Sequence, residues 1–182
     1  MDSTHLSSTN EDITQMEWLE YLMDTYGNAL TKISFTYIKD LGKAQEIVQD
    51  VFFLCYERYE EIHQIASLKA WLYKVTINRS KDSLRSGWLK RVILDNFIPV
   101  YTKAAHSTEQ TLIKQEQQED LLTHVLELPV KYRESLLLFY YEDLSIAEMV
   151  YTLQLNENTI KTRLKRGREL LKQSVKDGDF SG

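Results

Sequence analysis

The scarcity of turn-forming residues is the feature that most constrains the fold of this chain. Its 182 residues include only six glycines and two prolines, too few for the many tight turns of a β-rich fold. Apolar residues recur instead at the i, i+3, i+4 and i+7 spacing that places them on one face of an α-helix. The clearest run is Ala44, Ile47, Val48, Val51, Phe52 and Cys55. We therefore predict an all-α protein.

The same spacing divides the chain into two groups of helices. An early helix is predicted over residues 14–37 and a later one over 67–86. The apolar side of the later helix is formed by Leu68, Trp71, Leu72 and Val75. Helical spacing stops around Pro99 and resumes near residue 110. We predict two small helical domains, with the boundaries 1–13 (disordered tail), 14–88 (first domain), 89–109 (linker), 110–176 (second domain) and 177–182 (tail).

Composition and the cysteine count exclude several classes of protein. No apolar run approaches the roughly 20 residues of a membrane span, and the polar, acidic start of the chain is unlike a secretory signal. The single cysteine, Cys55, excludes an internal disulfide, and the four histidines are too scattered for metal-ligand spacing. We expect a cytosolic protein with no metal site, in which Cys55 is a buried apolar side chain.

Residues 145–171 predict a helix-turn-helix. Ser145 is suited to cap the first helix together with Glu148, and Asn156 is suited to cap the second. The inward stripe of the second helix is Ile160, Leu164, Gly167 and Leu171. At 100° per residue the side chains pointing away from it are Asn158, Lys161, Thr162, Lys165 and Arg166. A second helix of this kind enters the major groove of DNA and presents its early residues to base edges.

This second helix is strongly cationic within an acidic chain. The formal net charge is −5, yet residues 161–176 contain seven lysines and arginines and one acid, Glu169. A solvated helix face usually pairs its cations with acids at the i,i+4 spacing. The scarcity of acids therefore favours DNA binding over a merely solvated surface.

A second cationic stripe lies in the first domain. Residues 69–91 contain seven cations and one acid, Asp82. Four polar residues follow the i, i+4, i+7, i+11 spacing and form one line on the helix: Lys74, Asn78, Lys81 and Arg85. Residues 1–68, by contrast, contain 12 acids and 4 cations. We expect the two cationic helices to contact one nucleic acid and the acidic segment to face a protein.

Three blocks of sequence follow one another in a known order. They are GKAQEIVQDVFFLCYERY, SLKAWLYKVTINRSKDSLR and LPVKYRESLLLFYYEDLSIAEMVYTLQLNENTIKTRLKRGRELL. They resemble, respectively, the polymerase-binding helix, the helix for the −10 promoter element and the −35 recognition domain of bacterial extracytoplasmic-function (ECF) sigma factors, a group of the sigma-70 family. The order and spacing of the blocks also match those of that family.

The resemblance assigns three sets of site residues. The −35 element would be contacted by Asn158, Thr159, Lys161, Thr162, Lys165, Arg166 and Arg168. The −10 element would be contacted by Lys74, Asn78, Lys81 and Arg85. Core polymerase would be contacted by Glu46, Gln49, Asp50 and Phe53. By spacing alone, Glu46 and Asp50 would be only a solvated acid pair, and Trp71 is expected to pack in the core rather than stack on a base.

The resemblance also implies what the protein does. It would bind core RNA polymerase, direct it to one class of promoter DNA and help to open the duplex. It would not be an enzyme, and it would have no cofactor, no small-molecule substrate and no direct insertion into a membrane. An anti-sigma factor is implied as a further partner. Two other interpretations stay open: a helix-turn-helix regulator that binds its operator alone, and a helical adaptor whose cations meet an acidic protein.

The chain departs from the family pattern at a few positions. Lys43 and Gln45 stand where acids are common. In the helix-turn-helix, Val150 replaces a small residue, and overpacking there is expected to cost ~1–3 kcal/mol. Gln154 stands where glycine usually takes the left-handed turn, at an expected cost of ~1 kcal/mol.

Overall fold

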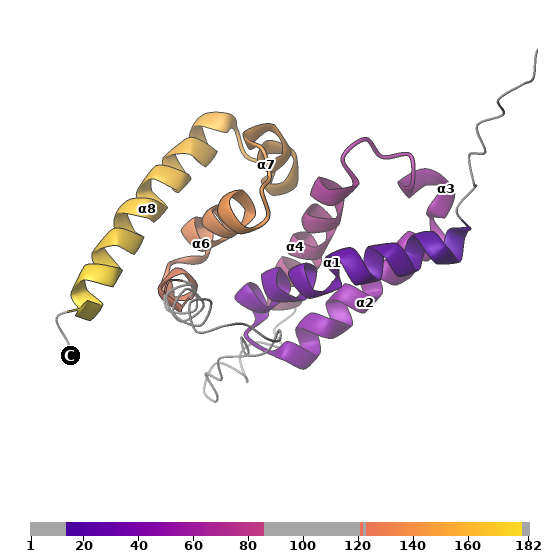
Figure 1. Cartoon of the computed structure of the whole chain (residues 1–182), viewed down its shortest axis with the longest axis horizontal. Coiled ribbons are helices and arrows are strands. Elements are labelled where there is room, and N and C mark those ends of the chain that lie inside the picture. The colour runs from indigo at the N-terminus through magenta and orange to yellow at the C-terminus, as the bar shows by residue number, and fades with distance from the viewer. Residues whose placement is uncertain (1–13, 86–120, 122, 180–182) are drawn as a thin grey trace, which may run out of the picture.

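The computed structural model describes residues 14–85, 121 and 123–179, in which every regular element is a helix. The first domain consists of α1 (Gln15–Ile38), α2 (Leu41–Glu57), α3 (Tyr59–Ile62) and α4 (Leu68–Arg85). The second consists of α6 (Val130–Leu136), the π-helical turn η2 (Leu137–Tyr141), α7 (Ile146–Leu153) and α8 (Glu157–Asp179), preceded by helical residues 123–127. Figure 1 shows the α1–α2 hairpin and α8 on opposite sides of the molecule. The predicted all-α architecture of two helical domains is confirmed.

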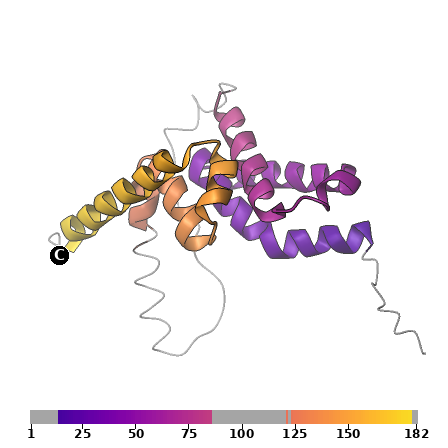
Figure 2. The same cartoon turned by 90° about the horizontal axis from the view of Figure 1, so that it is seen from above.

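Some of the predicted segments fall partly or wholly outside this description. The N-terminal tail (1–13) and the linker (89–109) lie outside the described residues. At the other end, α8 continues to Asp179, so it includes the first residues of the predicted tail (177–182). Figure 2 shows α8 extending away from the first domain towards the C-terminus.

Side-chain caps set the starts of α1 and α2, the first two helices of the first domain. The Thr14 hydroxyl accepts a hydrogen bond from the backbone N–H of Glu17 (3.2 Å), and the Glu17 carboxylate accepts one from the backbone N–H of Thr14 (2.9 Å). At the start of α2, the Asp40 carboxylate accepts a hydrogen bond from the backbone N–H of Lys43 (2.8 Å). These contacts satisfy N–H groups that have no partner within the helix.

The apolar stripe of α2 is buried as predicted, because it packs against α1 and α4. Its six members are Ala44, Ile47, Val48, Val51, Phe52 and Cys55. Cys55 is 0% exposed, and burial raises the pKa of its thiol to about 12. A thiol in this state is inert at neutral pH. Cys55 is therefore a packing residue.

The buried side of α4 differs from the predicted one. Of Leu68, Trp71, Leu72 and Val75, only Leu72 is fully buried. The buried residues are Ala70, Leu72, Tyr73, Thr76, Ile77 and Ser80. The predicted apolar side is therefore only partly buried, since Leu68, Trp71 and Val75 pack against the core without being fully covered. In the structure α4 packs against α1 and α2 within its own domain and also against α7 of the second domain.

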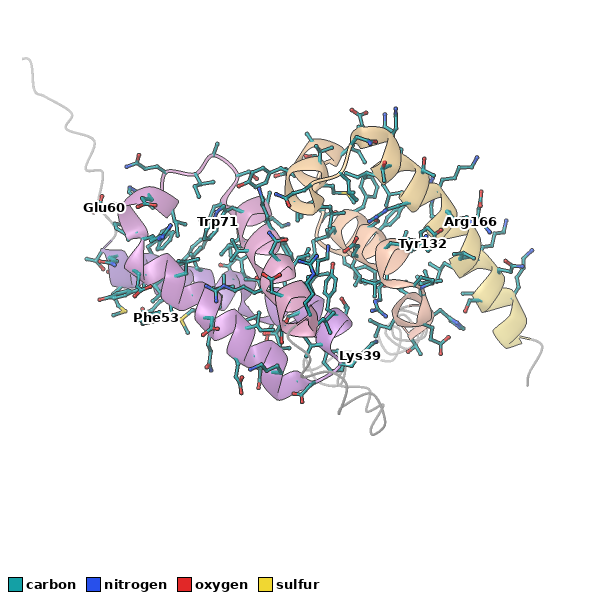
Figure 3. The ribbon with its side chains drawn as sticks, turned by 180° about the vertical axis from the view of Figure 1, so that it is seen from behind. Lys39, Phe53, Glu60, Trp71, Tyr132 and Arg166 are labelled. Atoms are coloured by element: carbon teal, nitrogen blue, oxygen red, sulfur yellow. The ribbon has the colours of Figure 1, made fainter. Side chains whose placement is uncertain are left out.

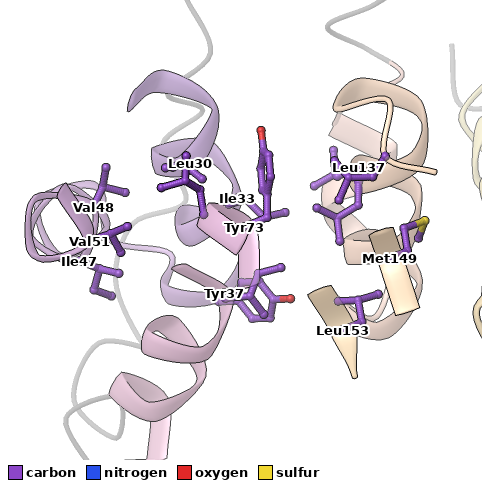
Figure 4. Close-up of a cluster of buried hydrophobic side chains, with 14 of the residues drawn as sticks. Leu30, Ile33, Tyr37, Ile47, Val48, Val51, Tyr73, Leu137, Met149 and Leu153 are labelled. Carbon is purple, nitrogen blue, oxygen red and sulfur yellow. The ribbon is translucent and has the colours of Figure 1, made fainter. Parts of the chain in front are cut away.

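The two domains share one apolar core. Tyr37 of α1 and Tyr73 of α4 are buried together with residues of both domains. Figure 4 shows their rings between the aliphatic side chains of the first domain and Leu137, Met149 and Leu153 of the second. The domains are therefore packed against each other in this structure.

Gln154, at the end of α7, adopts the left-handed conformation that was predicted for it (φ 56°, ψ 43°). Because a side chain is strained there and glycine is not, Gln154→Gly is expected to raise the free energy of unfolding by up to ~1 kcal/mol. Gln173→Gly is the matched control: its site lies inside α8, where glycine should instead cost ~1 kcal/mol. Urea unfolding of both variants measures the difference. A loss of stability in Gln154→Gly would contradict the assignment of strain.

Lys39, at the end of α1, also has a left-handed backbone (φ 60°). Partial burial, followed by the charge of Arg133, lowers the pKa of its amino group from 10.5 to about 8. The charged amine therefore destabilises the folded state. This destabilisation is complete below about pH 8 and disappears as the pH rises towards 10.5.

We expect Lys39→Met to raise the free energy of unfolding by ~1 kcal/mol at pH 7, an amount reduced for the partial exposure of the amine. The advantage over the unmodified chain should shrink by pH 10. Urea unfolding at both pH values measures it, with Lys32→Met on the same helix as the control. A gain that is independent of pH would show that the charge of Lys39 is not its cause.

Candidate nucleic-acid and polymerase interfaces

The helix-turn-helix forms through the predicted caps. The Ser145 hydroxyl accepts a hydrogen bond from the backbone N–H of Glu148 (3.2 Å), whose carboxylate accepts one from the backbone N–H of Ser145 (2.9 Å). The Asn156 side-chain oxygen accepts a hydrogen bond from the backbone N–H of Thr159 (2.8 Å). Both helices of the motif therefore begin where the sequence predicts.

The side chains of α8 divide into an inner and an outer set. Ile160, Leu164 and Gly167 are buried, and Leu171 is half-buried. A Cβ atom at Gly167 would lie 3.2 Å from a methyl carbon of Leu136, so the glycine allows α6 to approach closely. Among the predicted −35 residues, Thr159 is half-buried and the others are exposed: Asn158, Lys161, Thr162, Lys165, Arg166 and Arg168. The predicted reading face is thus a continuous exposed surface.

Two exposed cations of this face have acidic neighbours. Lys161 lies 2.5 Å from Glu157, and Arg166 lies 3.1 Å from Glu169. The prediction that these cations lack acidic partners is therefore only partly correct. It overlooked Glu157, which precedes residues 161–176, the segment over which the charges were counted. Exposed pairs of this kind contribute at most about 1 kcal/mol. A phosphate or a base could displace them at little cost.

A buried carboxylate, Glu134 of α6, connects four helices. Its side chain is 4% exposed and lies 2.7 Å from Arg163 of α8 and 3.3 Å from Lys81 of α4. It also accepts a hydrogen bond from the Tyr37 hydroxyl of α1. Its negative charge and burial together raise the pKa of that hydroxyl, with burial the larger cause.

Sequence reasoning assigned no role to Glu134 or to Arg163. One signal was present: Glu134 stands two residues before the apolar run that begins at Leu136, and an acid that is buried with such a run needs a partner. The partners themselves come from distant parts of the chain, and periodicity does not identify them. Arg163 lies between the exposed residues Thr162 and Lys165 and anchors α8 to α6.

The predicted −10 residues on α4 are not equally accessible. Asn78 and Arg85 are exposed. Lys74 is half-buried, with its amino group 4.0 Å from the centre of the Tyr151 ring, and Lys81 contacts Glu134. The second domain therefore engages two of the four residues.

The predicted polymerase residues Glu46, Gln49, Asp50 and Phe53 are all exposed on α2. Phe53 is 63% exposed, the largest fraction among the exposed large apolar side chains of the described residues. Each acid has a cationic neighbour, since Lys43 lies 2.5 Å from Glu46 and Arg79 lies 3.5 Å from Asp50. Figure 3 shows Phe53 and Arg166 on opposite sides of the molecule. The two surfaces can therefore face different partners.

Three further observations concern Trp71, metal-binding groups and membrane-spanning helices. Trp71 is half-buried and packs against the core, which agrees with the expected packing role (Figure 3). Within the described part of the chain, no group of three or more histidine, cysteine or acidic side chains is arranged to hold a metal ion. None of the helices described here has the length and apolar character needed to span a membrane.

Comparison with known proteins identifies the family. The family model for sigma-70 region 2 matches residues 22–90, and the model for sigma-70 region 4 matches residues 118–171. RNA polymerase sigma factor SigV of Bacillus subtilis (strain 168) is 28% identical over 152 residues, which cover 82% of this chain and 86% of that protein. ECF RNA polymerase sigma factor SigW of the same organism is 22% identical over 173 residues, which cover 86% and 88%. The chain is an ECF sigma factor of the sigma-70 family.

Solved structures agree with this sigma factor fold. The sigma factor RpoE of Bartonella quintana, in complex with the anti-sigma factor NepR, superposes with a TM-score of 0.64 at 19% identity over 88% of this chain and 98% of that chain. CnrH, in complex with the cytosolic domain of CnrY, gives a TM-score of 0.57 at 18% identity over 91% of each chain. The region 2 match of this sigma factor ends beyond α4, and its region 4 match contains α6, α7 and most of α8.

Proposed function

We propose that this ECF sigma factor recruits core RNA polymerase to one class of promoter, with α8 on the −35 element and α4 on the −10 element. The observation that carries the proposal is the exposed cationic face of α8, presented by a helix-turn-helix within the region 4 match. The protein would act by binding and supply no chemistry of its own. Some of its DNA contacts would be electrostatic contacts with phosphates, and others would be contacts with base edges that depend on the sequence.

The α8 face is proposed to read bases in the major groove through Lys161, Thr162, Lys165 and Arg166. Lysine and arginine pair with the acceptor atoms of guanine, and threonine contacts the methyl group of thymine. Phosphate contacts are proposed for Asn158, Thr159 and Arg168, which would hold the helix in register. Arg168 already donates a hydrogen bond to the Tyr140 hydroxyl (3.0 Å), which supports its side chain from η2. The −10 contacts are proposed for Lys74, Asn78, Lys81 and Arg85.

The α2 surface is proposed to bind core polymerase through Glu46, Gln49, Asp50 and Phe53. An acidic surface repels DNA and suits a cationic protein partner. Phe53 would add an apolar anchor at its centre, since burying an exposed phenyl ring on binding is favourable.

Transcription in vitro tests the proposal. Purified core polymerase with and without this protein is supplied with a pool of genomic promoter fragments. We expect the protein to produce new transcripts that start downstream of a shared sequence motif. Absence of any new transcript, with a known sigma factor active in the same assay, would refute it.

The free protein is expected to bind promoter DNA weakly and without sequence preference. The acidic first domain opposes the approach to phosphates until polymerase covers it. Gel shifts that compare the free protein with the holoenzyme measure the difference, and the salt dependence of holoenzyme binding should show a slope of about 0.9 per phosphate contacted. Tight, sequence-specific binding by the free protein would instead indicate a helix-turn-helix regulator that acts alone.

An anti-sigma factor is proposed as a further partner. The support is the structural likeness to RpoE, which was solved with the anti-sigma factor NepR. Affinity purification of the tagged protein from its native host, before and after stress, tests this proposal. We expect an additional protein that leaves the complex when transcription from the target promoters rises. Recovery of polymerase subunits alone under every condition would count against it.

A further inference from the structure

One acid, Glu169, stands on the side of α8 that is proposed to bind DNA. It follows Thr162 by seven residues and Lys165 by four, spacings that place all three side chains on one side of a helix. All three are exposed. Phosphates repel a carboxylate at such a place, so Glu169 weakens DNA binding unless its charge is used by a neighbouring group.

The neighbouring group is the guanidinium of Arg166, which is proposed to read a base. Its Nη1 atom donates a hydrogen bond to the Glu169 carboxylate (3.1 Å). A guanidinium presents its N–H donors in one rigid plane, and arginine recognises guanine by two hydrogen bonds, to the O6 and N7 atoms. The orientation of the plane decides whether both bonds form. The contact with Glu169 restricts that orientation and does not use the donors of Nε and Nη2.

A second ion pair on α8 provides a comparison, because it has the same charges but a different cation. Glu157 lies 2.5 Å from Lys161, and both side chains are exposed, as are those of Arg166 and Glu169. A lysine ammonium is a point charge with rotatable donors on a flexible stem, so a neighbouring acid does not orient its hydrogen bonds as it orients a planar guanidinium. The two acids therefore allow an orienting effect to be distinguished from an effect of charge.

We propose that Glu169 is a positioning residue, whose carboxylate holds the guanidinium of Arg166 in the orientation that reads a guanine of the −35 element. The inference rests on the proposed function, because it requires α8 to read that element. Glu169 itself contacts no base and acts only through Arg166. Holding one long side chain in its bound orientation changes recognition by about two- to tenfold, so the effect is confined to the base that Arg166 reads.

The experiment is transcription by the holoenzyme from a library of randomised −35 sequences. Glu169→Ala should lower the preference for guanine by about two- to tenfold at the position where Arg166→Ala removes it, and should leave positions that depend on Lys165 unchanged. Glu157→Ala is the matched control. It also removes an acid beside a cation of α8, so it should raise activity at all promoters alike without changing any base preference. Thermal unfolding of each variant checks that the fold is intact.

Two further variants separate orientation from charge. Glu169→Gln keeps an acceptor oxygen and should retain more of the guanine preference than Glu169→Ala. In a chain that already carries Arg166→Ala, Glu169→Ala should change no base preference, because no guanidinium is left to orient. A uniform rise in activity for Glu169→Ala, equal to that of Glu157→Ala, overturns the proposal.

Failure of this inference is distinguishable from failure of the proposed function. Transcription whose base preference depends on Arg166 but not on Glu169 overturns the positioning role alone. Absence of any transcription with the unmodified protein refutes the proposed function, and the positioning role falls with it.

Discussion

Glu134→Ala is expected to lower the free energy of unfolding by about 3 kcal/mol, because removal of one partner of a buried ion pair leaves the other partners unpaired. Arg163, Lys81 and the Tyr37 hydroxyl all lose their shared carboxylate. We take the low end of the range because Lys81 and Arg163 are themselves partly exposed. Urea and thermal unfolding measure the change, which should lower the melting temperature by roughly 6–12 °C.

Two controls define the origin of this loss. Glu127→Ala, at an exposed helical position of the same domain, should change stability by no more than about 0.5 kcal/mol. Glu134→Gln keeps the shape and one acceptor oxygen but removes the charge. Its loss of stability should therefore lie between the losses of Glu134→Ala and Glu127→Ala. If Glu134→Ala behaves like Glu127→Ala, the carboxylate does not hold the four helices together.

Alanine at Lys165 or Arg166 is expected to relax base preference at one or two positions of the −35 element. Each lost base contact should cost ~1–3 kcal/mol in promoter recognition. Both side chains are exposed, opposite the buried Ile160 and Leu164, so the fold should be unchanged within about 0.5 kcal/mol. Transcription from a library of randomised −35 sequences measures the preference of each variant.

Lys172→Ala is the matched control for this experiment. Lys172 is exposed further along α8, where a contact would reach the phosphate backbone rather than the bases. Its loss should weaken all promoters alike and lower the salt slope by about 1. If all three variants lose activity uniformly with unchanged base preference, the cationic face is a phosphate or protein contact and the assignment of reading residues is wrong.

Features that depend on nearby residues were predictable from the sequence. The capping boxes and the α2 stripe require only residues within a few turns of one another, and helical spacing reveals them directly. The left-handed turn at Gln154 was expected from the family resemblance, because glycine usually stands at that position in the family. The exposure of Lys165 and Arg166 followed from their angle to Ile160.

The accessible side of α4 could not be found in this way. A 3.6-residue period identifies the side of a helix that meets its nearest neighbours, but α4 is buried on more than one side. The second covering surface comes from α7, which lies beyond the long segment that separates the domains in the chain. Helical spacing therefore correctly predicted that Lys74 and Lys81 share one side of α4. It did not predict their contacts with Tyr151 and Glu134 of the second domain.

The sequence by itself determined the helices, their caps, the charge of each face and the family, because each of these depends on the identity and spacing of residues along the chain. Tertiary structure decided which charges meet. Tyr37 and Glu134 are 97 residues apart in sequence and share a hydrogen bond, and the same carboxylate joins α4 to α8. A buried charge is stable only beside partners that compensate its lost hydration, and those partners are chosen by how the two domains pack, which local spacing does not encode.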